Sequence, residues 1–290
     1  MPVTGLEIPE HHGPGPFDAV RWFARHFVHL PCRYLSVPET GAPIEEHPWG
    51  ISGFVVEVQG EWFLVTAGHC LTEVDDARRK GVVFPHWDLD DAASMGARYN
   101  QVGPFAFDNA IKGRAYDEST GMDYGVIHLR EVYRPQMRAN GIIPLKAEHC
   151  QEPGGYDRFF LLGVPQETIT TGPHPARMAK GLRLVDIVPV RRDEVPEDMR
   201  AKPWPRVFYR VISGLEDVAP PVKSLKGMSG GPIFAVKEVD GRQYYWLVGV
   251  QSGFHQQEAI ISTCPVDRLH SVLEQWLCLQ QEGDNPEPRT

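Results

Sequence analysis

Ser229 lies between glycines in the stretch SLKGMSGGPIF, residues 224–234. A serine hydroxyl is a poor nucleophile at neutral pH, so chemistry here requires a nearby base and hydrogen-bond donors for the charge that develops on an attacked carbonyl. Glycine allows successive backbone N–H groups to point at one spot, and Gly227 and Ser229 are the candidate donors. A glycine-rich turn before a strand explains the same stretch without any chemistry.

A base and an acid stand elsewhere in the chain. His69 is the last but one residue of the segment FLVTAGHC, which predicts a strand that ends with this imidazole after small residues. Asp123 heads the apolar strand predicted for MDYGVIHL, whereas the alternative acids Asp108 and Asp117 precede no such strand. A packed histidine and a turn-capping acid are the structural explanations, but Ser229, His69 and Asp123 together favour nucleophilic catalysis.

The elements that must position these residues are mostly strands. The chain holds 28 glycines and 26 prolines in scattered positions, which favours short strands joined by turns, as in barrels and sandwiches. Residues 49–130 predict strands with a turn at Gly60 and Glu61. Strands are predicted again from residue 157 onward, where Asp240 and Gly241 form a hairpin signal.

Two amphipathic helices flank the strands. Residues 17–30, FDAVRWFARHFVHL, carry apolar side chains at helical spacing. The second helix lies in the C-terminal segment, whose apolar residues share one predicted helical face: Val266, Leu269, Val272, Leu273, Trp276 and Leu277.

Composition narrows the function classes. The 290 residues carry a formal charge of −9, which argues against a nucleic-acid partner because no concentrated basic face is available. No apolar run approaches the roughly 20 residues that span a bilayer, so no membrane partner is expected. The five cysteines include no C-x-x-C pair and favour a reduced, cytoplasmic compartment. The histidines show no metal spacing, and we expect neither a metal nor a cofactor.

The segments VTAGHC, MDYGVIHL and KGMSGGPIF, in this order, resemble the three signature segments of trypsin-like (chymotrypsin-fold) serine proteases. WLVGVQSGF resembles the strand that pairs with substrate backbone in that family. The resemblance implies an all-β fold of two six-stranded antiparallel barrels, with a C-terminal helix and an N-terminal helical extension. The domain boundaries we predict are an extension over 1–48, a first barrel over 49–135, a connection over 136–156, a second barrel over 157–264 and a helix and tail over 265–290.

Carried onto these positions, the resemblance implies a serine endopeptidase that works through an acyl-enzyme intermediate on a protein or peptide substrate. Ser229 is then the nucleophile, His69 the general base and acid, and Asp123 its buried partner. The N–H groups of Gly227 and Ser229 form the oxyanion hole. Ser252 supports the aspartate, and residues 252–254 bind the substrate as an added strand, which makes Ser252, Gly253 and Phe254 substrate-binding residues.

Departures from the family pattern are informative. Phe54 and Leu225 stand where many secreted members have cysteines, which agrees with a reduced compartment and leaves Cys70 as a packed thiol. Met228 stands where zymogen-activated members have an aspartate, which places the chain closer to the bacterial, non-zymogen members.

The sequence leaves three properties undetermined: the substrate preference, the activity itself and the role of the N-terminal extension. Lys223, at the position that lines the base of the primary pocket in many members, favours an acidic substrate side chain unless it is simply solvated. A catalytically silent scaffold that binds proteins is the alternative to the peptidase, and an esterase with the same triad is a third hypothesis. The extension over 1–48 is a candidate surface for a regulatory partner.

Overall fold

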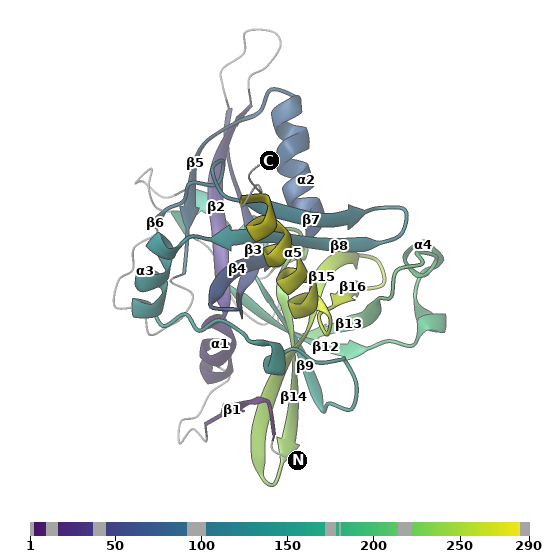
Figure 1. The fold of residues 1–290 in the computed structure, drawn as a ribbon. Helices are drawn as coiled ribbons and strands as arrows, with labels where there is room; N and C mark the ends of the chain where they lie inside the picture. Colours follow the sequence, from purple (N-terminus) through teal and green to yellow (C-terminus); the bar gives the residue numbers. More distant parts are fainter. Residues whose placement is uncertain are drawn as a thin grey trace, which may run out of the picture.

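The computed structural model describes residues 3–9, 17–36, 45–91, 103–171, 178–179, 181–213 and 222–284. Two seven-stranded antiparallel sheets dominate this part of the chain, and an α-helix follows the last strand (Figure 1). The predicted all-β fold with two antiparallel barrels is confirmed, but each sheet has seven strands rather than the predicted six. Within the described residues, no helix is both long and apolar enough to cross a bilayer.

The first sheet has the order β6-β5-β2-β3-β4-β8-β7. Its strands are β2 (Phe27–Ser36), β3 (Glu45–Val58), β4 (Glu61–Thr66), β5 (Val83–Leu89), β6 (Gly103–Pro104), β7 (Lys112–Asp117) and β8 (Met122–Leu129). The turn between β3 and β4 is centred on Gln59 and Gly60, both with positive φ, one residue earlier than predicted. Tight hairpins adopt such φ values because the turn then matches the twist of its strands.

The second sheet has the order β1-β15-β14-β9-β12-β13-β16, and a further pairing of β15 with β16 closes six of these strands into a barrel. They are β9 (Arg158–Gly163), β12 (Arg183–Pro189), β13 (Val207–Ser213), β14 (Pro232–Val239), β15 (Arg242–His255) and β16 (Ile260–Pro265). The β14–β15 hairpin turns at Asp240 and Gly241, as predicted. The seventh strand, β1 (Leu6–Ile8), comes from the N-terminal extension and pairs with β15 outside the closed barrel.

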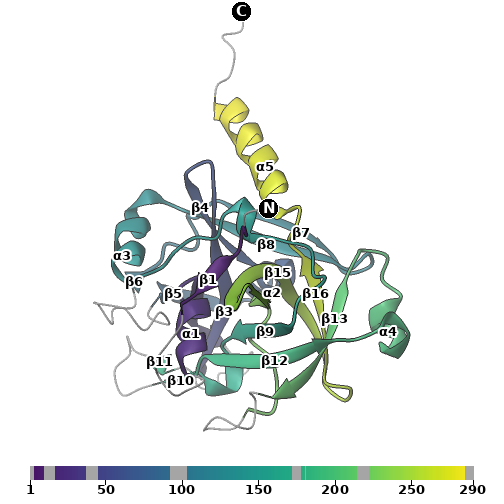
Figure 2. The ribbon, with the colours of Figure 1, turned by 90° about the horizontal axis from the view of Figure 1, so that it is seen from below.

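Short elements connect and flank the sheets. The helices are α1 (Phe17–Ala24), α2 (Gly68–Arg79), α3 (Arg134–Ala139), α4 (Glu197–Arg200) and α5 (Leu269–Asp284). Single 3-10 turns occur at η1 (Glu131–Tyr133), η2 (Ala147–His149), η3 (Gln166–Thr168) and η4 (Arg192–Glu194), and β10 (Thr170–Thr171) pairs with β11 (Met178–Ala179). Figure 2 shows α1 and α4 on opposite sides of the second barrel.

The prediction of a helix over residues 17–30 is wrong in its second half. Helix α1 ends at Ala24, and Phe27 and Leu30 lie in β2, which pairs with β3 and β5. Residues 27–30 pair with residues 51–54 of β3, and this tertiary pairing overrides the local helical spacing. The first sheet therefore begins at Phe27, inside the segment predicted to be an extension over 1–48.

One apolar cluster is shared by the two barrels, and α1 inserts Phe23 into it. The Phe23 ring stacks on Phe234 of β14 with 4.8 Å between centroids and meets the edge of Tyr245 of β15 at 5.1 Å. From the first sheet, Phe54 and Phe63 join the same cluster. Helix α1 therefore joins the barrels by burying apolar surface, the dominant favourable contribution to such contacts.

Helix α5 packs its apolar face against the first sheet, where Trp276 meets the edge of the Phe63 ring at a centroid distance of 5.7 Å. Leu269, Leu273 and Leu277 are buried, as their spacing predicts. Val272, predicted to share that face, is 56% exposed. The apolar stripe of α5 is thus narrower than the sequence indicates.

This difference predicts opposite outcomes for two neighbouring substitutions. Leu273→Ala should lower the free energy of unfolding by about 2–5 kcal/mol, because it removes buried methyl groups and leaves a cavity. Val272→Ala is the matched control and should change it by less than about 0.5 kcal/mol, since the side chain already contacts water. Urea unfolding of both variants measures the difference, and equal losses would contradict the burial described for α5.

Candidate active site

His69 lies in the first turn of helix α2, which begins directly after β4. The sequence predicts a strand end at this point, so that prediction is wrong: β4 ends at Thr66 and the helix starts at Gly68. Gly68 allows the close approach, since a Cβ there would lie 2.7 Å from the carbonyl oxygen of Tyr124. The start of α2 therefore rests directly on the strand that carries Asp123.

Asp123 is the second residue of β8 and is almost fully buried. Its Oδ1 accepts the backbone N–H of His69 at 2.8 Å, and its Oδ2 lies 2.7 Å from Nδ1 of the same residue. The Ser252 hydroxyl of β15 donates to Oδ2 at 2.8 Å. Burial alone favours the neutral acid, but His69 and Ser252 hold the pKa of Asp123 below 3.8.

The same contacts determine which ring nitrogen of His69 carries a proton and how basic the ring is. The Asp123 carboxylate can only accept a hydrogen bond, so Nδ1 of His69 carries the proton that it donates to Oδ2. The other ring nitrogen, Nε2, is left to exchange a proton with a substrate or nucleophile. Burial disfavours the charged imidazole, but the Cys70 sulfur and the Asp123 carboxylate outweigh burial and raise the pKa of His69 above 6.5. His69 is therefore a strengthened base, with its ring oriented by a buried carboxylate.

Cys70 is buried, as predicted for a packed thiol, but it does not point away from His69. Both residues lie on helix α2, and the Cys70 Sγ is 3.7 Å from the Nε2 of His69. The same sulfur lies 3.7 Å from the carbonyl oxygen of Ser229. Cys70 thus connects the start of α2 in the first barrel with the Ser229 loop of the second. All five cysteines of the chain are free thiols.

The loop that carries Ser229 is held by its own backbone. The N–H of Met228 donates to the carbonyl oxygen of Leu225, and the N–H of Gly231 donates to the carbonyl oxygen of Met228. Gly227 and Gly230 have φ values of +92° and +87°, which only glycine adopts without strain. A Cβ at Gly230 would overlap the side chain of Thr66, so this turn also requires glycine to approach the first barrel.

Two backbone donors of this loop are left without a partner. Within the part of the chain that the structure describes, the N–H groups of Gly227 and Ser229 make no hydrogen bond, whereas those of Met228, Gly230 and Gly231 do. The Ser52 hydroxyl donates to the Gly227 carbonyl at 2.8 Å, which fixes the orientation of that peptide. Among the described residues no hydrogen bond joins Ser229 to His69, a common situation in a site without substrate.

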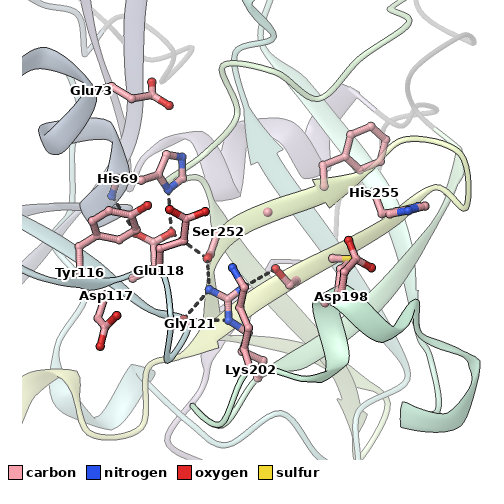
Figure 3. A pocket seen from close by; sticks show the side chains of 16 residues that line it. His69, Glu73, Tyr116, Asp117, Glu118, Gly121, Asp198, Lys202, Ser252 and His255 are labelled. Carbon is pink, nitrogen blue, oxygen red and sulfur yellow. Dashed lines mark hydrogen bonds and ion pairs between the residues drawn. The ribbon is translucent and has the colours of Figure 1, made fainter. Parts of the chain in front are cut away.

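A pocket of about 450 Å³ opens beside His69 (Figure 3). Its wall includes the predicted substrate-binding residues Ser252, Gly253 and Phe254. Figure 3 shows Glu73 on the His69 side of the pocket and Asp198 with His255 on the opposite side. The described residues contain no group of His, Cys, Asp and Glu side chains that could hold a metal ion.

Lys223 does not line this pocket. Its side chain is exposed, and its backbone N–H donates to the Glu167 carboxylate at 2.6 Å. The neighbouring N–H of Ser224 donates to the same oxygen at 2.8 Å. Glu167 therefore anchors the backbone at Lys223, and the lysine charge lies apart from the pocket at His69.

Sequence reasoning did not find Arg206, which lines the pocket and donates to Ser252. Arg206 precedes β13 and lies in no motif, so only the folded chain shows that it reaches the residues around Asp123. Tyr116 was also missed; its ring centroid lies 6.3 Å from that of His69. Its place at the end of β7, which pairs with β8 at Asp123, follows from strand pairing alone.

Comparison with known proteins gives structural neighbours only. No protein-family profile and no curated protein matches the chain. The protease Anisep from Arthrobacter nicotinovorans has a TM-score of 0.43 at 14% identity, covering 83% of this chain and 90% of that one. Tobacco etch virus protease in complex with product has a TM-score of 0.41 at 13% identity, covering 93% and 86%. The thermostable serine protease AL20 from an extremophilic microorganism has a TM-score of 0.38 at 11% identity, covering 83% and 91%.

These neighbours are proteases by name. Identities of 11–14% and TM-scores of 0.38 to 0.43 are too low to transfer an activity or a residue role to this chain. The function is therefore inferred from the side chains of the chain itself.

The pairing of His69 with Asp123 predicts a pH dependence. Because folding raises the pKa of His69, the pairing stabilises the fold fully below pH 6.5, and this contribution is lost as the pH rises through the folded pKa. Because folding lowers the pKa of Asp123, its contribution is present above pH 3.8 and is lost as the pH falls through the folded pKa. The free energy of unfolding, measured across the pH range, should therefore fall at both the acid end and the alkaline end.

An NMR titration of the His69 imidazole tests the cause. The wild-type protein should give a pKa above 6.5, and Asp123→Asn should lower it, since burial then acts without the opposing carboxylate. Asp117→Asn is the control, because Asp117 accepts from Ser119 and does not contact His69. An unchanged titration in Asp123→Asn contradicts the pairing.

Proposed function

We propose that the chain is a serine endopeptidase that cleaves peptide bonds through an acyl-enzyme intermediate. The observation that carries this proposal is the double hydrogen bond of Asp123 to the N–H and Nδ1 of His69. It turns Nε2 toward the Cys70 sulfur, 3.7 Å away, and that sulfur lies 3.7 Å from the Ser229 carbonyl oxygen, so Nε2 faces the Ser229 loop. The unpartnered N–H groups of Gly227 and Ser229 supply the second requirement of acyl transfer, a site for an oxyanion.

In the proposed reaction, the Ser229 hydroxyl attacks the substrate carbonyl while Nε2 of His69 takes its proton. The Gly227 and Ser229 N–H groups stabilise the oxyanion, and loss of one such donor typically costs about 10²–10³ in rate. The imidazolium then gives its proton to the leaving amine, which breaks the peptide bond and leaves an ester on Ser229. Water, deprotonated by the same imidazole, hydrolyses that ester and frees the serine.

The strand edge at residues 252–254 supports binding of an extended substrate. Strand β14 pairs with β15 only as far as the Pro232–Val250 pair, whereas β16 covers the other edge of β15 to His255. Beyond Gln251, which bonds with Gly230 and Gly231, the edge of β15 toward the pocket has no paired strand among the described residues. A peptide that adds a strand here lies next to His69.

Activation by a new N-terminus paired with the residue before the nucleophile does not suit this chain. Met228 is fully buried in the core of the second barrel, among residues such as Leu225 and Ile233. Its thioether is at most a weak hydrogen-bond acceptor and carries no charge for an ammonium group. We propose that the loop is held instead by its glycines and by Ser52, as in a non-zymogen enzyme.

Ser229 and Cys70 are both potential nucleophiles near His69, and we assign the role to Ser229. Cys70 is only 6% exposed and lies against the backbone of Ser229, whereas Ser229 is half-buried and adjoins the free N–H donors. A nucleophile must reach the substrate carbonyl while that carbonyl faces those donors. Ser229 alone belongs to the loop that carries them.

Labelling with a fluorophosphonate probe tests this assignment. The wild-type protein should be labelled, Ser229→Ala should lose all labelling and peptide hydrolysis, and the control Cys70→Ala should keep both. Labelling that survives in Ser229→Ala but not in Cys70→Ala assigns the chemistry to the thiol. A wild-type protein that neither reacts nor hydrolyses peptides supports the silent binding scaffold instead.

Charges around the pocket predict a substrate preference. Glu73, Glu118 and Asp198 line it with exposed carboxylates, and Lys202 supplies an opposing charge. We therefore expect a basic side chain near the cleaved bond to raise kcat/KM by about two- to fivefold over an acidic one, a small effect because water screens exposed charges.

A peptide panel separates this preference from the one that Lys223 suggests. Glu118→Gln should weaken the preference for basic peptides, and added salt should do the same. Lys223→Ala is the matched control and should leave the preference unchanged. A preference for acidic peptides that disappears in Lys223→Ala contradicts the role given to the pocket carboxylates.

A further inference from the structure

Arg206 joins the two barrels at the point where Asp123 is buried. Its guanidinium donates to the carbonyl oxygen of Gly121 from Nε at 2.8 Å and again from Nη2. Nη1 donates to the Ser262 hydroxyl at 2.7 Å, and Nη2 donates to the Ser252 hydroxyl at 2.9 Å. All these acceptors are uncharged oxygens, one on the turn before β8 and two on strands of the second barrel. Dashed lines in Figure 3 mark the hydrogen bonds that reach Ser252 and Gly121.

The contact with Arg206 determines where the hydroxyl proton of Ser252 points. A guanidinium has no acceptor, so the Ser252 oxygen must accept from Arg206. The single hydroxyl proton of Ser252 is then free to donate to Oδ2 of Asp123, 2.8 Å away. Arg206 therefore polarises a hydroxyl toward the carboxylate that holds His69, and hydrogen bonds linked in this way strengthen one another.

The contact with Gly121 fixes the backbone that leads into Asp123. Gly121 has a φ of +89°, and a Cβ at this position would lie 2.9 Å from the Cβ of Lys202 and 3.0 Å from Nε of Arg206. The turn is thus seated against the segment that carries Arg206, an approach that only glycine allows. The N–H of Trp204 adds a second anchor by donating to the carbonyl of Thr120 at 2.8 Å.

We propose that Arg206 is a positioning residue for the active site: by holding Ser252 and Gly121 on either side of Asp123, it sets the orientation and basicity of His69. This inference rests on the proposed peptidase function. Arg206 acts only through these neighbours and not on the reacting atoms. Its positive charge, one hydroxyl away from Asp123, also opposes protonation of the imidazole.

Loss of Arg206 should therefore raise the pKa of His69. A positive charge disappears, and Asp123 loses an oriented hydrogen bond, so both changes favour the imidazolium. The other titratable and charged groups that face His69 or line the pocket beside it stay in place: Cys70, Glu73, Tyr116, Asp117, Glu118, Asp123, Asp198, Lys202 and His255. A shift in titration is thus attributable to Arg206.

The first measurement needs no turnover. In a Ser229→Ala background, NMR titration should show a higher His69 pKa in Arg206→Gln than in the parent protein. Arg210→Gln is the matched control, since Arg210 lies four residues on in β13, is well exposed and only approaches Glu194 at 3.9 Å. Its loss removes the same charge without touching Ser252 or Gly121, and the His69 titration should not move.

The second measurement follows peptide hydrolysis in the full-length enzyme. Arg206→Gln should lower kcat by about 10- to 100-fold and change KM little, because misplacement of a catalytic group costs transition-state stabilisation rather than binding. The acid limb of the pH profile should move to higher pH. Arg206→Lys keeps the positive charge but cannot reach three acceptors in one plane. Compared with Arg206→Gln, it should therefore bring the pH profile back toward that of the wild-type enzyme, while kcat should recover less.

The outcomes separate this inference from the proposed function. A folded Arg206→Gln protein whose His69 titrates as in Arg210→Gln overturns the role of Arg206. Should Arg206→Gln not fold, Ser252→Ala must show the same alkaline shift, and an unchanged titration there overturns the inference equally. If the wild-type protein cleaves no peptide but the titration shifts as expected, the peptidase proposal fails while the positioning role of Arg206 stands.

Discussion

The burial of the Asp123 carboxylate is the constraint on which the site depends. A buried charge is costly unless hydrogen bonds and an opposite charge replace the lost water. Helix α2 of the first barrel supplies two N–H groups of His69, and β15 of the second supplies the Ser252 hydroxyl. Movement of one barrel against the other would leave this carboxylate short of partners. The geometry of the site and the strength of the inter-barrel contact are therefore coupled.

The inter-barrel contact is itself built from an apolar core with a polar anchor. Phe23 stacks between the barrels, and the adjacent His26 is buried with its pKa lowered by desolvation to about 3, so it is neutral at physiological pH. Its ring reaches the carbonyl oxygen of Ile143 at 2.6 Å and the Tyr245 hydroxyl at 2.8 Å. A neutral histidine satisfies one acceptor and one donor at once, which fixes α1 without burying a charge.

The sequence could predict the residues with local signatures but not those that act across the fold. Asp123 before an apolar strand and the hairpin at Asp240 were predictable because each depends on a few neighbouring residues. Helix α2 was not predicted, since its start depends on the fit of Gly68 against Tyr124 in a distant strand. Arg206 gave no signal, because its contacts join segments 46 to 85 residues away along the chain.

Each of the two terminal helices packs on the barrel that is farther from it along the chain. Phe23 of α1 precedes every strand of the first barrel, yet its ring contacts Phe160 and Phe234 of the second. Trp276 of α5 follows every strand of the second barrel, yet it packs on Phe63 of the first. The first barrel therefore lacks part of its apolar contacts until the last helix is synthesised. A ribosome-bound chain that stops before residue 269 therefore lacks a completed first barrel, although all of that barrel's strands have already emerged.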